Sequence, residues 1–317
     1  MESCPHRPET LRTLFEARDY VTGEVFRIER CTGCGVAFTL PRPAQLGRYY
    51  PPQYYGPTAE GRFPRPVEIA QRWLCARRAR AVERAAGRVG RVLDVGCGRG
   101  LLLDAFRRRG WEVAGTELSD ASAAYPRALG IPVHVGPIRQ ASWEPGSFDA
   151  VLLWHVIEHW PDPHEAIREA HRLLRDGGVL AIGAPNFESP EARLARHGWF
   201  HLDVPRHLAH LGPSSLWPAL AAHGFSIVRS SFFAPEYDTF SFVQSVQNLL
   251  GLRPNLLYDV LRGDRAKLGA RAGPAAIAAS LALALPLGML ALPATALLAL
   301  ARRGSSLTVL ARKRSGA

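Results

Sequence analysis

Three glycines alternate with other residues directly after a short apolar run. The run VLDV at residues 92–95 is followed by Gly96, Gly98 and Gly100, and then by the helix-like segment LLLDAFRRRG. Glycines at a turn from strand to helix let the backbone approach a ligand closely, and the helix N-terminus offers N–H groups to it. The spacing G-x-G-x-G differs from the G-x-G-x-x-G of pyrophosphate-binding folds. The turn predicts a small-molecule site.

Two acids stand where predicted strands end. Asp94 lies at the end of the strand before the glycines, and the next β-rich segment, EVAGTE, ends in Glu117. A carboxylate at the end of the second strand can accept hydrogen bonds from the two hydroxyls of a ribose. Together with the glycine turn, Glu117 predicts a cofactor that contains a nucleoside. The alternative is a structural turn beside a surface glutamate.

Histidines gather in two later segments. The segment HVIEH carries His155, Glu158 and His159 after a predicted strand. If that turn is helical, the three side chains share one face and could hold a divalent metal. The second cluster, WFHLDVPRHLAH, contains His201, Asp203, Arg206, His207 and His210. A histidine near neutral pKa suits proton removal from an acceptor, and Arg206 could hold an anionic substrate. The alternative for both clusters is hydrogen bonding to loop backbone.

Cysteines near the N-terminus raise the question of a metal. Cys31 and Cys34 have zinc-knuckle spacing, whereas the upstream pair, Cys4 and His6, is irregular. Four such ligands would close a structural zinc site, and the alternative is a metal-free remnant of a zinc ribbon. The five cysteines do not form the pattern of a secreted disulfide framework, so we expect a reducing cytoplasm.

The elements that must position these residues alternate along the chain. Six β-rich runs separated by helical stretches extend from residue 91 to residue 234, which predicts an α/β fold with a mostly parallel sheet covered by helices on both faces. Residues 67–86 form a predicted basic amphipathic helix. A further β-rich segment, SSLTVLARKR, is predicted to return antiparallel as the last strand.

With these motifs in place, the chain resembles the class I S-adenosylmethionine (SAM)-dependent methyltransferases. DVGCGRG resembles the first motif of that family, FDAVLLWHVIEHWPDP its fourth-strand motif and LLRDGGVLAIGAPN its fifth-strand segment. The resemblance is to a small-molecule branch that often begins with a cysteine-bearing, zinc-ribbon-like segment. It implies a Rossmann-like, seven-stranded sheet and SAM as the cofactor.

The resemblance also implies roles for particular residues. The glycines would line the methionine end of SAM, Glu117 would hold its ribose, and Leu118 would lie beside its adenine. The implied cofactor-binding set is Asp94, Gly96, Cys97, Gly98, Gly100, Glu117, Leu118, Ile138 and Trp154. The candidate catalytic residues are His155, His159 and His207. In the similar quinone-biosynthesis O-methyltransferases an acidic pair followed by histidine serves a metal, and here His155 replaces the first acid.

A run without a charged side chain, residues 274–301, precedes the predicted last strand. Pro286 and Pro293 divide it into short helices, and because both ends lead back to one sheet we expect a helical hairpin lying on the membrane surface. Basic residues flank it: Arg262, Arg265, Lys267 and Arg271 before, and Arg302, Arg303, Arg312, Lys313 and Arg314 after. The alternatives are a helical pair packed on the core or in a homodimer, and a two-pass hairpin.

Three regions follow from these patterns. They are a zinc-ribbon-like segment (1–60), a methyltransferase domain (61–234 plus 305–317) and an insertion with the apolar hairpin (235–304). We expect methyl transfer to a small-molecule or lipid-linked acceptor, such as a sugar, polyketide or quinone-like ring, by a peripheral or monotopic protein at the cytoplasmic membrane face. The alternatives are a non-enzymatic scaffold that keeps the SAM fold and an RNA methyltransferase. The net charge of +11 favours the latter, but no RNA-binding module or Asn/Asp-Pro-Pro-Tyr motif accompanies it, so a nucleic-acid partner is disfavoured.

Overall fold

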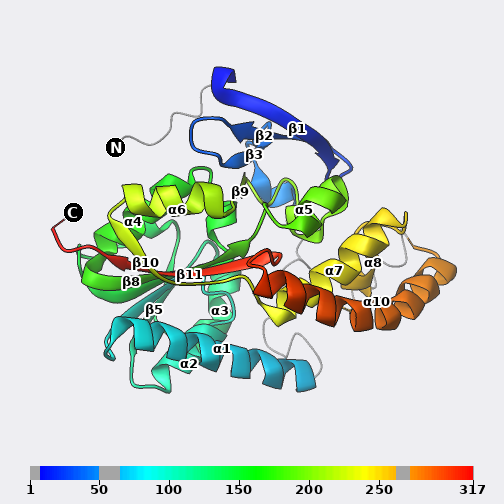
Figure 1. The fold of residues 1–317 in the computed structure, drawn as a ribbon. Helices are drawn as coiled ribbons and strands as arrows, with labels where there is room; N and C mark the ends of the chain where they lie inside the picture. Colours follow the sequence, from blue (N-terminus) through cyan, green and yellow to red (C-terminus); the bar gives the residue numbers. More distant parts are fainter. Residues whose placement is uncertain (1–7, 50–64, 262–271, 317) are drawn as a thin grey trace.

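The central sheet of the computed structural model has seven strands, in the order β10-β11-β8-β7-β4-β5-β6 (Figure 1). The structure describes residues 8–49, 65–261 and 272–316. The strands are β4 (Arg91–Val95), β5 (Glu112–Glu117), β6 (Val133–Val135), β7 (Phe148–Trp154), β8 (Leu174–Pro185), β10 (Phe225–Ser231) and β11 (Ser306–Lys313). Only β11 runs antiparallel, to both β8 and β10. The predicted α/β fold with a mostly parallel seven-stranded sheet is confirmed.

Helices cover both faces of this sheet, as the alternating pattern predicted. On one face, α1 (Arg65–Ala86) and α2 (Leu101–Arg107) bury apolar side chains that form one core cluster with the strands. On the other face, α4 (Pro163–Leu173) and α6 (Pro213–Ala222) belong to a second cluster. The remaining short helices near the sheet are α3 (Asp120–Ala128) and α5 (Pro190–Ala195). Short 3-10 turns lie at Pro8–Thr10, Leu46–Tyr49, Ile138–Gln140, Ile157–His159, Arg196–Gly198 and Phe200–Leu202.

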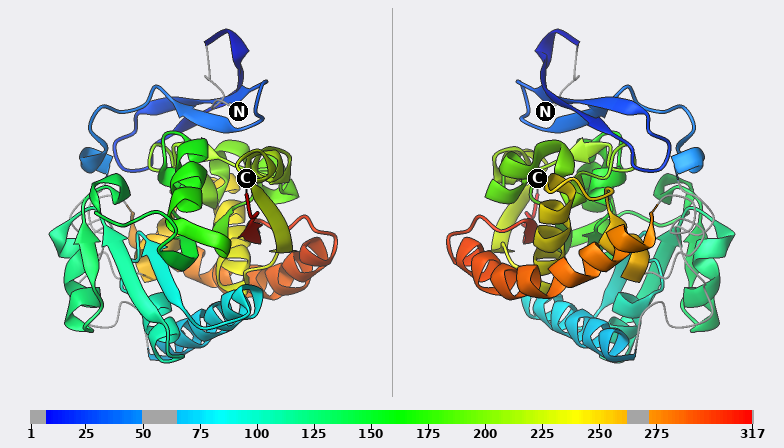
Figure 2. Two further views of the ribbon diagram at one scale, coloured as in Figure 1. Left: turned by 90° about the vertical axis from the view of Figure 1, so that its left-hand side faces the viewer. Right: turned by 90° about the vertical axis from the view of Figure 1, so that its right-hand side faces the viewer.

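The N-terminal region forms a second, antiparallel sheet. Its strands are β1 (Leu11–Arg18), β2 (Val25–Cys31), β3 (Ala37–Leu40) and β9 (Ala209–His210). Because β9 comes from the loop between β8 and α6, the pairing of β3 with β9 fastens this sheet to the main domain. Figures 1 and 2 show the N-terminal sheet above the domain, on the side of α4 and α6 and opposite α1. The predicted residue boundaries of the three regions stay predictions.

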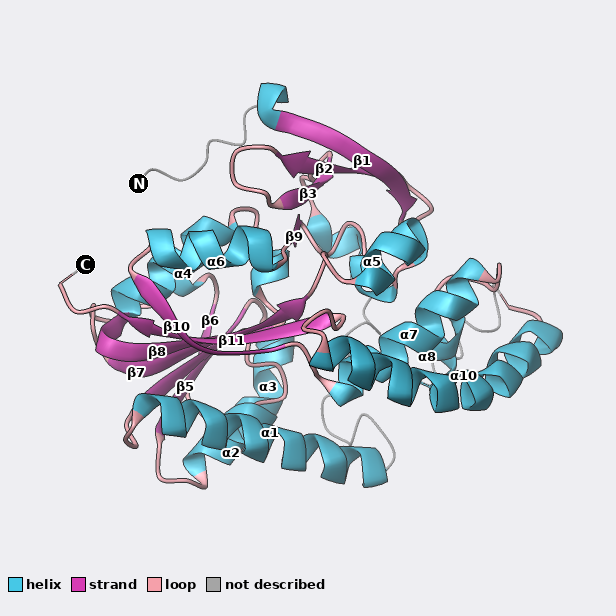
Figure 3. Cartoon of the chain, viewed as in Figure 1, coloured by secondary structure: helices cyan, strands magenta, loops and turns pink. Residues whose placement is uncertain are grey.

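Between β10 and β11 the chain forms α7 (Pro235–Leu249), α8 (Leu256–Leu261) and α10 (Pro274–Leu300) (Figure 3). The expected hairpin in the apolar run is wrong, because α10 is one continuous helix of 27 residues. Pro286 and Pro293 lie about two turns apart, so both rings are on the same side of the helix. Each proline removes only one backbone hydrogen bond, and the surrounding Ala and Leu residues are strong helix formers.

The long helix α10 packs on α7 along a narrow strip. Ser280 Oγ donates to Gln247 Oε1 at 2.7 Å, and Gln247 Nε2 donates to the Ser280 carbonyl at 2.9 Å. Ala291 packs with Val243 of α7 and Leu257 of α8. By length and composition α10 could cross a membrane, and in the described part of the chain it is the one helix that could. Its most apolar window has a mean hydropathy of 2.2 and is only 11% buried, unlike the core helix of a soluble domain.

Candidate active site

The glycine turn after β4 is built for close approach by a ligand. Gly96, Gly98 and Gly100 have φ values of 65°, 53° and 68°, in the left-handed region that favours glycine. A Cβ atom at Gly96 would lie 2.8 Å from Val156, whereas a Cβ at Gly98 would meet nothing within 4 Å. Packing therefore explains Gly96, but the absent side chain of Gly98 leaves space that a bound molecule can use.

Two acids face this turn. The backbone N–H of Gly98 donates to the Glu117 carboxylate, and Asp94 is buried below it. Burial, reinforced by the charge of Glu117, raises the pKa of Asp94 to about 8. Asp94 Oδ1 has no hydrogen-bond partner among the described residues, so a cationic group would compensate this carboxylate. SAM carries an ammonium, a sulfonium and a ribose, and the residues present therefore fit it: Asp94 near the ammonium and Glu117 on the ribose.

Other residues of the predicted cofactor set differ in their placement. Leu118 is 79% exposed just after β5, where an adenine ring would cover it. Ile138 and Cys97 are buried in the two core clusters, which leaves chiefly their backbone to a ligand. The Trp154 ring lies beneath the Arg78 guanidinium of α1, 4.4 Å from it, rather than within the histidine cluster.

The segment after β7 does not form the expected helical face. His155 has a left-handed backbone with φ of 53°, and the following 3-10 turn begins at Ile157. The Nδ1 atom of His155 lies 3.2 Å from Glu158 Oε1, and the centroid of the His155 ring lies 4.2 Å from that of the Tyr237 ring. The prediction that His155, Glu158 and His159 share one face is wrong, because the left-handed residue turns His155 toward α7.

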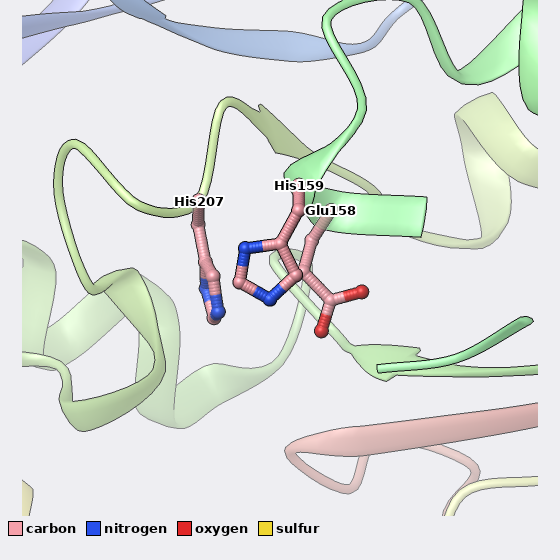
Figure 4. Close-up of side chains that lie close together, drawn as sticks. All are labelled: Glu158, His159 and His207. Carbon is pink, nitrogen blue, oxygen red and sulfur yellow. The ribbon is translucent and has the colours of Figure 1, made fainter. Parts of the chain in front are cut away.

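Instead, the structure brings His207 to Glu158 and His159. The candidate ligand atoms of these three residues lie within 4.8 Å of one another (Figure 4). His159 Nδ1 is 2.9 Å from the carbonyl of Arg206, and His207 Nδ1 is 2.8 Å from that of His201. A carbonyl only accepts, so both Nδ1 atoms carry the proton and both Nε2 atoms keep a lone pair.

Electrostatics fix the charge states of this cluster. Burial opposes ionisation of Glu158, but the hydrogen bond and charge of His155, aided by His207, hold its pKa at about 2. Burial, aided by His159, lowers the pKa of His207 to about 4. An ionised carboxylate beside the neutral His207 imidazole and the His159 ring is a donor set for a divalent cation, and imidazoles that donate Nδ1–H to carbonyls are typical of metal ligands. The same neutral His207 can accept a proton without a metal.

Arg206 cannot hold a substrate, and that prediction is wrong. Its side chain is completely buried, with Nη2 2.9 Å from Asp19 and 2.7 Å from Asp203. Its Nη1 donates to the Tyr49 carbonyl at 3.0 Å. Two carboxylates already compensate the guanidinium, so Arg206 fixes the loop carrying His207 to the N-terminal region.

His210 of the second cluster and the described cysteines of the N-terminal region lie in contacts within the protein. Thr39 Oγ1 donates to the His207 carbonyl at 2.7 Å and lies 2.9 Å from His210 Nε2. Cys31 is buried in the core and Cys34 is half-buried. Cys4 and His6 lie outside the described residues, so the four-ligand zinc set stays a prediction.

Tyr237 is a site residue that the sequence did not reveal. It belongs to the first turn of α7, in the insertion, and its pKa is raised by burial. Its ring contacts His155 and lies 6.4 Å from that of His201. The only signal was its position shortly after the sixth predicted strand, where the chain returns to the edge of the sheet that carries the site.

A family comparison now identifies the class. The sequence model of a methyltransferase domain family matches residues 67–230, which is more than half of the chain. The chain belongs to this family, and the class I SAM-dependent methyltransferase inferred from the glycine turn and Glu117 is confirmed. Strands β1, β2 and β3 of the N-terminal sheet and helix α10 lie outside the match.

Individual relatives show which members of the family the chain is similar to. The chain is 37% identical over 121 residues to a ubiquinone biosynthesis O-methyltransferase of Pseudomonas paraeruginosa, covering 36% of this chain and 52% of the relative. It is 42% identical over 104 residues to that of Alkalilimnicola ehrlichii, covering 30% and 42%. The matches thus span about half the length of these relatives. The solved [4+2]-cyclase SpnF shares the fold, with a TM-score of 0.50 and 21% identity over 76% of this chain and 81% of that one.

Proposed function

We propose that this methyltransferase acts on a hydroxyl of a quinone-like or lipid-linked acceptor at the cytoplasmic face of the membrane. The observation that carries the proposal is a neutral, buried His207 beside Glu158 and His159, beyond the end of β7. Ligands of open α/β sheets bind at this carboxyl edge, where the glycine turn also lies. The similarity to ubiquinone biosynthesis O-methyltransferases supports an oxygen nucleophile on a quinone precursor.

The chain's own residues supply positioning and a proton acceptor. Bound SAM supplies a methyl group already activated by its sulfonium. Asp94 and Glu117 hold the cofactor, and Tyr237 with His155 closes the site on the side of α7. The acceptor hydroxyl gives its proton to His207 Nε2, which passes it to solvent after transfer. Alignment is the larger contribution, and the general base adds about 10²- to 10⁴-fold.

The membrane location is supported by α10 and by the strand that follows it. Leu285, Met289 and Leu300 are 73%, 65% and 83% exposed. Because β11 pairs with both β8 and β10, one crossing by α10 would separate it from its partner strands. A helix lying in the membrane plane keeps the sheet intact, with Arg302 and Arg303 at its exposed end. A lipid-confined acceptor would then meet the site at the leaflet.

The test is incubation of purified enzyme with methyl-labelled SAM and a membrane extract, followed by identification of the labelled product. We expect a labelled methoxy group on a lipid-soluble aromatic compound. His207→Gln should lower the rate by roughly 100-fold while SAM still binds, and the exposed His197→Gln serves as the control. Label in RNA, or SAM binding without label in any product, would contradict the proposal. A fully active His207→Gln variant would remove the proposed base.

A further inference from the structure

A groove outside the candidate active site lies between α1, the β10–β11 edge and the start of α7. It has a volume of about 140 Å³. Its apolar wall includes Leu74 and Val82 of α1, Phe233 before α7 and Leu310 of β11, and the guanidinium groups of Arg77 and Arg229 line it as well. The groove therefore combines an apolar surface with cationic groups, which is the chemistry of a site for an anionic amphiphile.

The charges in the groove are unequally compensated. Arg78 pairs with Glu236 and stacks on Trp154. Arg77 lies 5.0 Å from the centre of the Trp73 ring. Within the described part of the chain, no carboxylate pairs with Arg77 or Arg229. Two guanidinium groups thus remain for an anion, and guanidinium binds phosphate oxygens in bidentate fashion.

The surface around the groove is suited to a bilayer. Ile69 and Trp73 of α1 are 60% and 55% exposed, and Val228 of β10 and Phe233 are 48% and 42% exposed. In both views of Figure 2, as in Figure 1, α1 and α10 lie along the lower side of the molecule, away from the N-terminal sheet. Exposed aromatic and aliphatic side chains among arginines are typical of a face that rests at the membrane interface.

We propose that this groove binds the phosphate of an anionic phospholipid from the bilayer on which α10 rests. Arg77 and Arg229 hold the phosphate, and part of an acyl chain lies against Leu74, Phe233 and Leu310. The site would fix the orientation of the enzyme on the leaflet. This proposal rests on the proposed membrane association, and it is independent of the acceptor and of His207.

The first test measures binding to phosphatidylcholine vesicles with and without phosphatidylglycerol. The variant is Arg77→Gln with Arg229→Gln, and the control, Arg12→Gln with Arg193→Gln, removes the same charge from exposed positions on β1 and α5. We expect the variant to bind the anionic vesicles roughly 30-fold more weakly, since each basic residue near the surface contributes a similar share of the binding free energy. The control should lose much less affinity. Equal losses in both would overturn the site and indicate diffuse attraction.

The second test separates a lipid site from a phosphate ion site. Monomeric dihexanoyl phosphatidylglycerol is titrated into the full chain by calorimetry, with Ala81→Trp as a variant that fills the groove and keeps its charge. We expect saturable binding that is lost in Ala81→Trp and in the double variant, with little competition from inorganic phosphate. Binding unaffected by either variant, or complete competition by phosphate, would overturn the lipid site.

SAM affinity and melting temperature, measured on each variant, should match the wild type and so exclude misfolding. If wild type binds no vesicle of either composition, the membrane association itself fails. If wild type binds vesicles and the double variant binds equally well, only the lipid site fails. These results do not test the proposed methyl transfer to the acceptor, because none of the substituted arginines lies in the candidate active site.

Discussion

Glu117 and its neighbour Thr116 both join the glycine turn to the end of β5, and Glu117 contributes the carboxylate. Its carboxylate accepts the Gly98 N–H, so it is already positioned where a ribose would lie. Glu117→Gln should weaken SAM binding about tenfold, since hydrogen bonds to a charged acceptor contribute about 1.5–3 kcal/mol and an amide replaces them only in part. Isothermal titration with SAM measures this. The control is Asp120→Asn, an exposed acid that pairs only with Arg127; a loss of equal size there would contradict the assignment.

Buried neutral histidines should make the protein acid-sensitive. Burial lowers the pKa of these histidines from 6.5 to about 3 or 4: His201, His207, His210 and His223. The unfolded chain takes up their protons near pH 6.5 and the folded chain only near pH 4, so their stabilisation is present above pH 6.5 and is lost as pH falls toward 4. Burial raises the pKa of Asp94 to about 8 and that of Asp238 to about 6, and it also raises the pKa values of Glu117 and Glu191. These four acids act in the opposite direction, but the histidines, with His171 whose pKa burial also lowers, outnumber them.

We expect the urea concentration at the unfolding midpoint to decrease as the pH is lowered from 6.5 to 4.5. Circular dichroism measures the unfolding at each pH. A midpoint that stays constant or rises over this interval would show that the histidines are not held neutral.

The sequence predicted the role of a residue correctly where the groups that it contacts are close to it along the chain. The glycine turn and Glu117 follow from the ends of two consecutive strands, and strand-end logic places them together. Arg206 was misassigned because its partner Asp19 is 187 residues away, in a different sheet. The helical face expected to carry His155, Glu158 and His159 did not form, because a left-handed backbone at the non-glycine residue His155 has no sequence signature.

At the scale of elements, the N-terminal sheet acts as a support for the loop that carries His207. Strand β3 pairs with β9, and Thr39 of β3 donates to the His207 carbonyl at 2.7 Å. The buried pair of Arg206 and Asp19 fixes the residue before His207 to the same region. Thr39 and Asp19 of the N-terminal region thus hold the loop that presents the His207 imidazole, which is the proposed proton acceptor.

Thr39→Val tests this support. The variant keeps the shape of the side chain but loses the contacts to the His207 carbonyl and to His210 Nε2. Leaving these buried groups without the hydroxyl should cost about 1–3 kcal/mol in the free energy of unfolding. Because a small displacement of a catalytic group is costly, we expect kcat to fall about tenfold or more while the affinity for SAM is unchanged. Steady-state kinetics over a pH series, with titration calorimetry, provide the measurement.

The matched control is Thr32→Val, which loses a 3.1 Å hydrogen bond to the Thr10 carbonyl just beyond the ends of β2 and β1 in the same N-terminal region. If both variants reduce kcat alike, the sheet contributes only stability. The strands of the central sheet were predictable because β-rich runs and turn residues are local, whereas the strands β1, β2, β3 and β9 of the second sheet were not predicted. The continuity of α10 was not, because the local rule for proline gives way to a helix-favouring environment of Ala and Leu.

For the molecule as a whole, the insertion joins the apolar helix α10 to the candidate active site. Glu191 of α5 accepts hydrogen bonds from Ser241 and Ser245 of α7, and from Ser305 just before β11. This buried carboxylate ties both ends of the insertion to the domain. Helix α7 packs on α10 and places Tyr237 against His155. A membrane contact at α10 would therefore reach the proposed acceptor site through α7 alone. No pattern in the sequence linked these parts, because the partners of Glu191 lie 50 to 114 residues away along the chain.

The arrangement predicts that exposed leucines of α10 drive membrane attachment. Leu285→Gln and Leu300→Gln, made together, place polar groups at side chains that are 73% and 83% exposed, so the folded state loses little. Each buried leucine contributes about 1.5–3 kcal/mol on leaving water, so partition into vesicles should fall at least about 30-fold. Sedimentation with vesicles gives the partition coefficient. The control is Leu194→Gln on α5, which is 80% exposed and should leave partition unchanged. If the chain lacking residues 272–303 and the full chain partition alike, α10 has no role at the membrane.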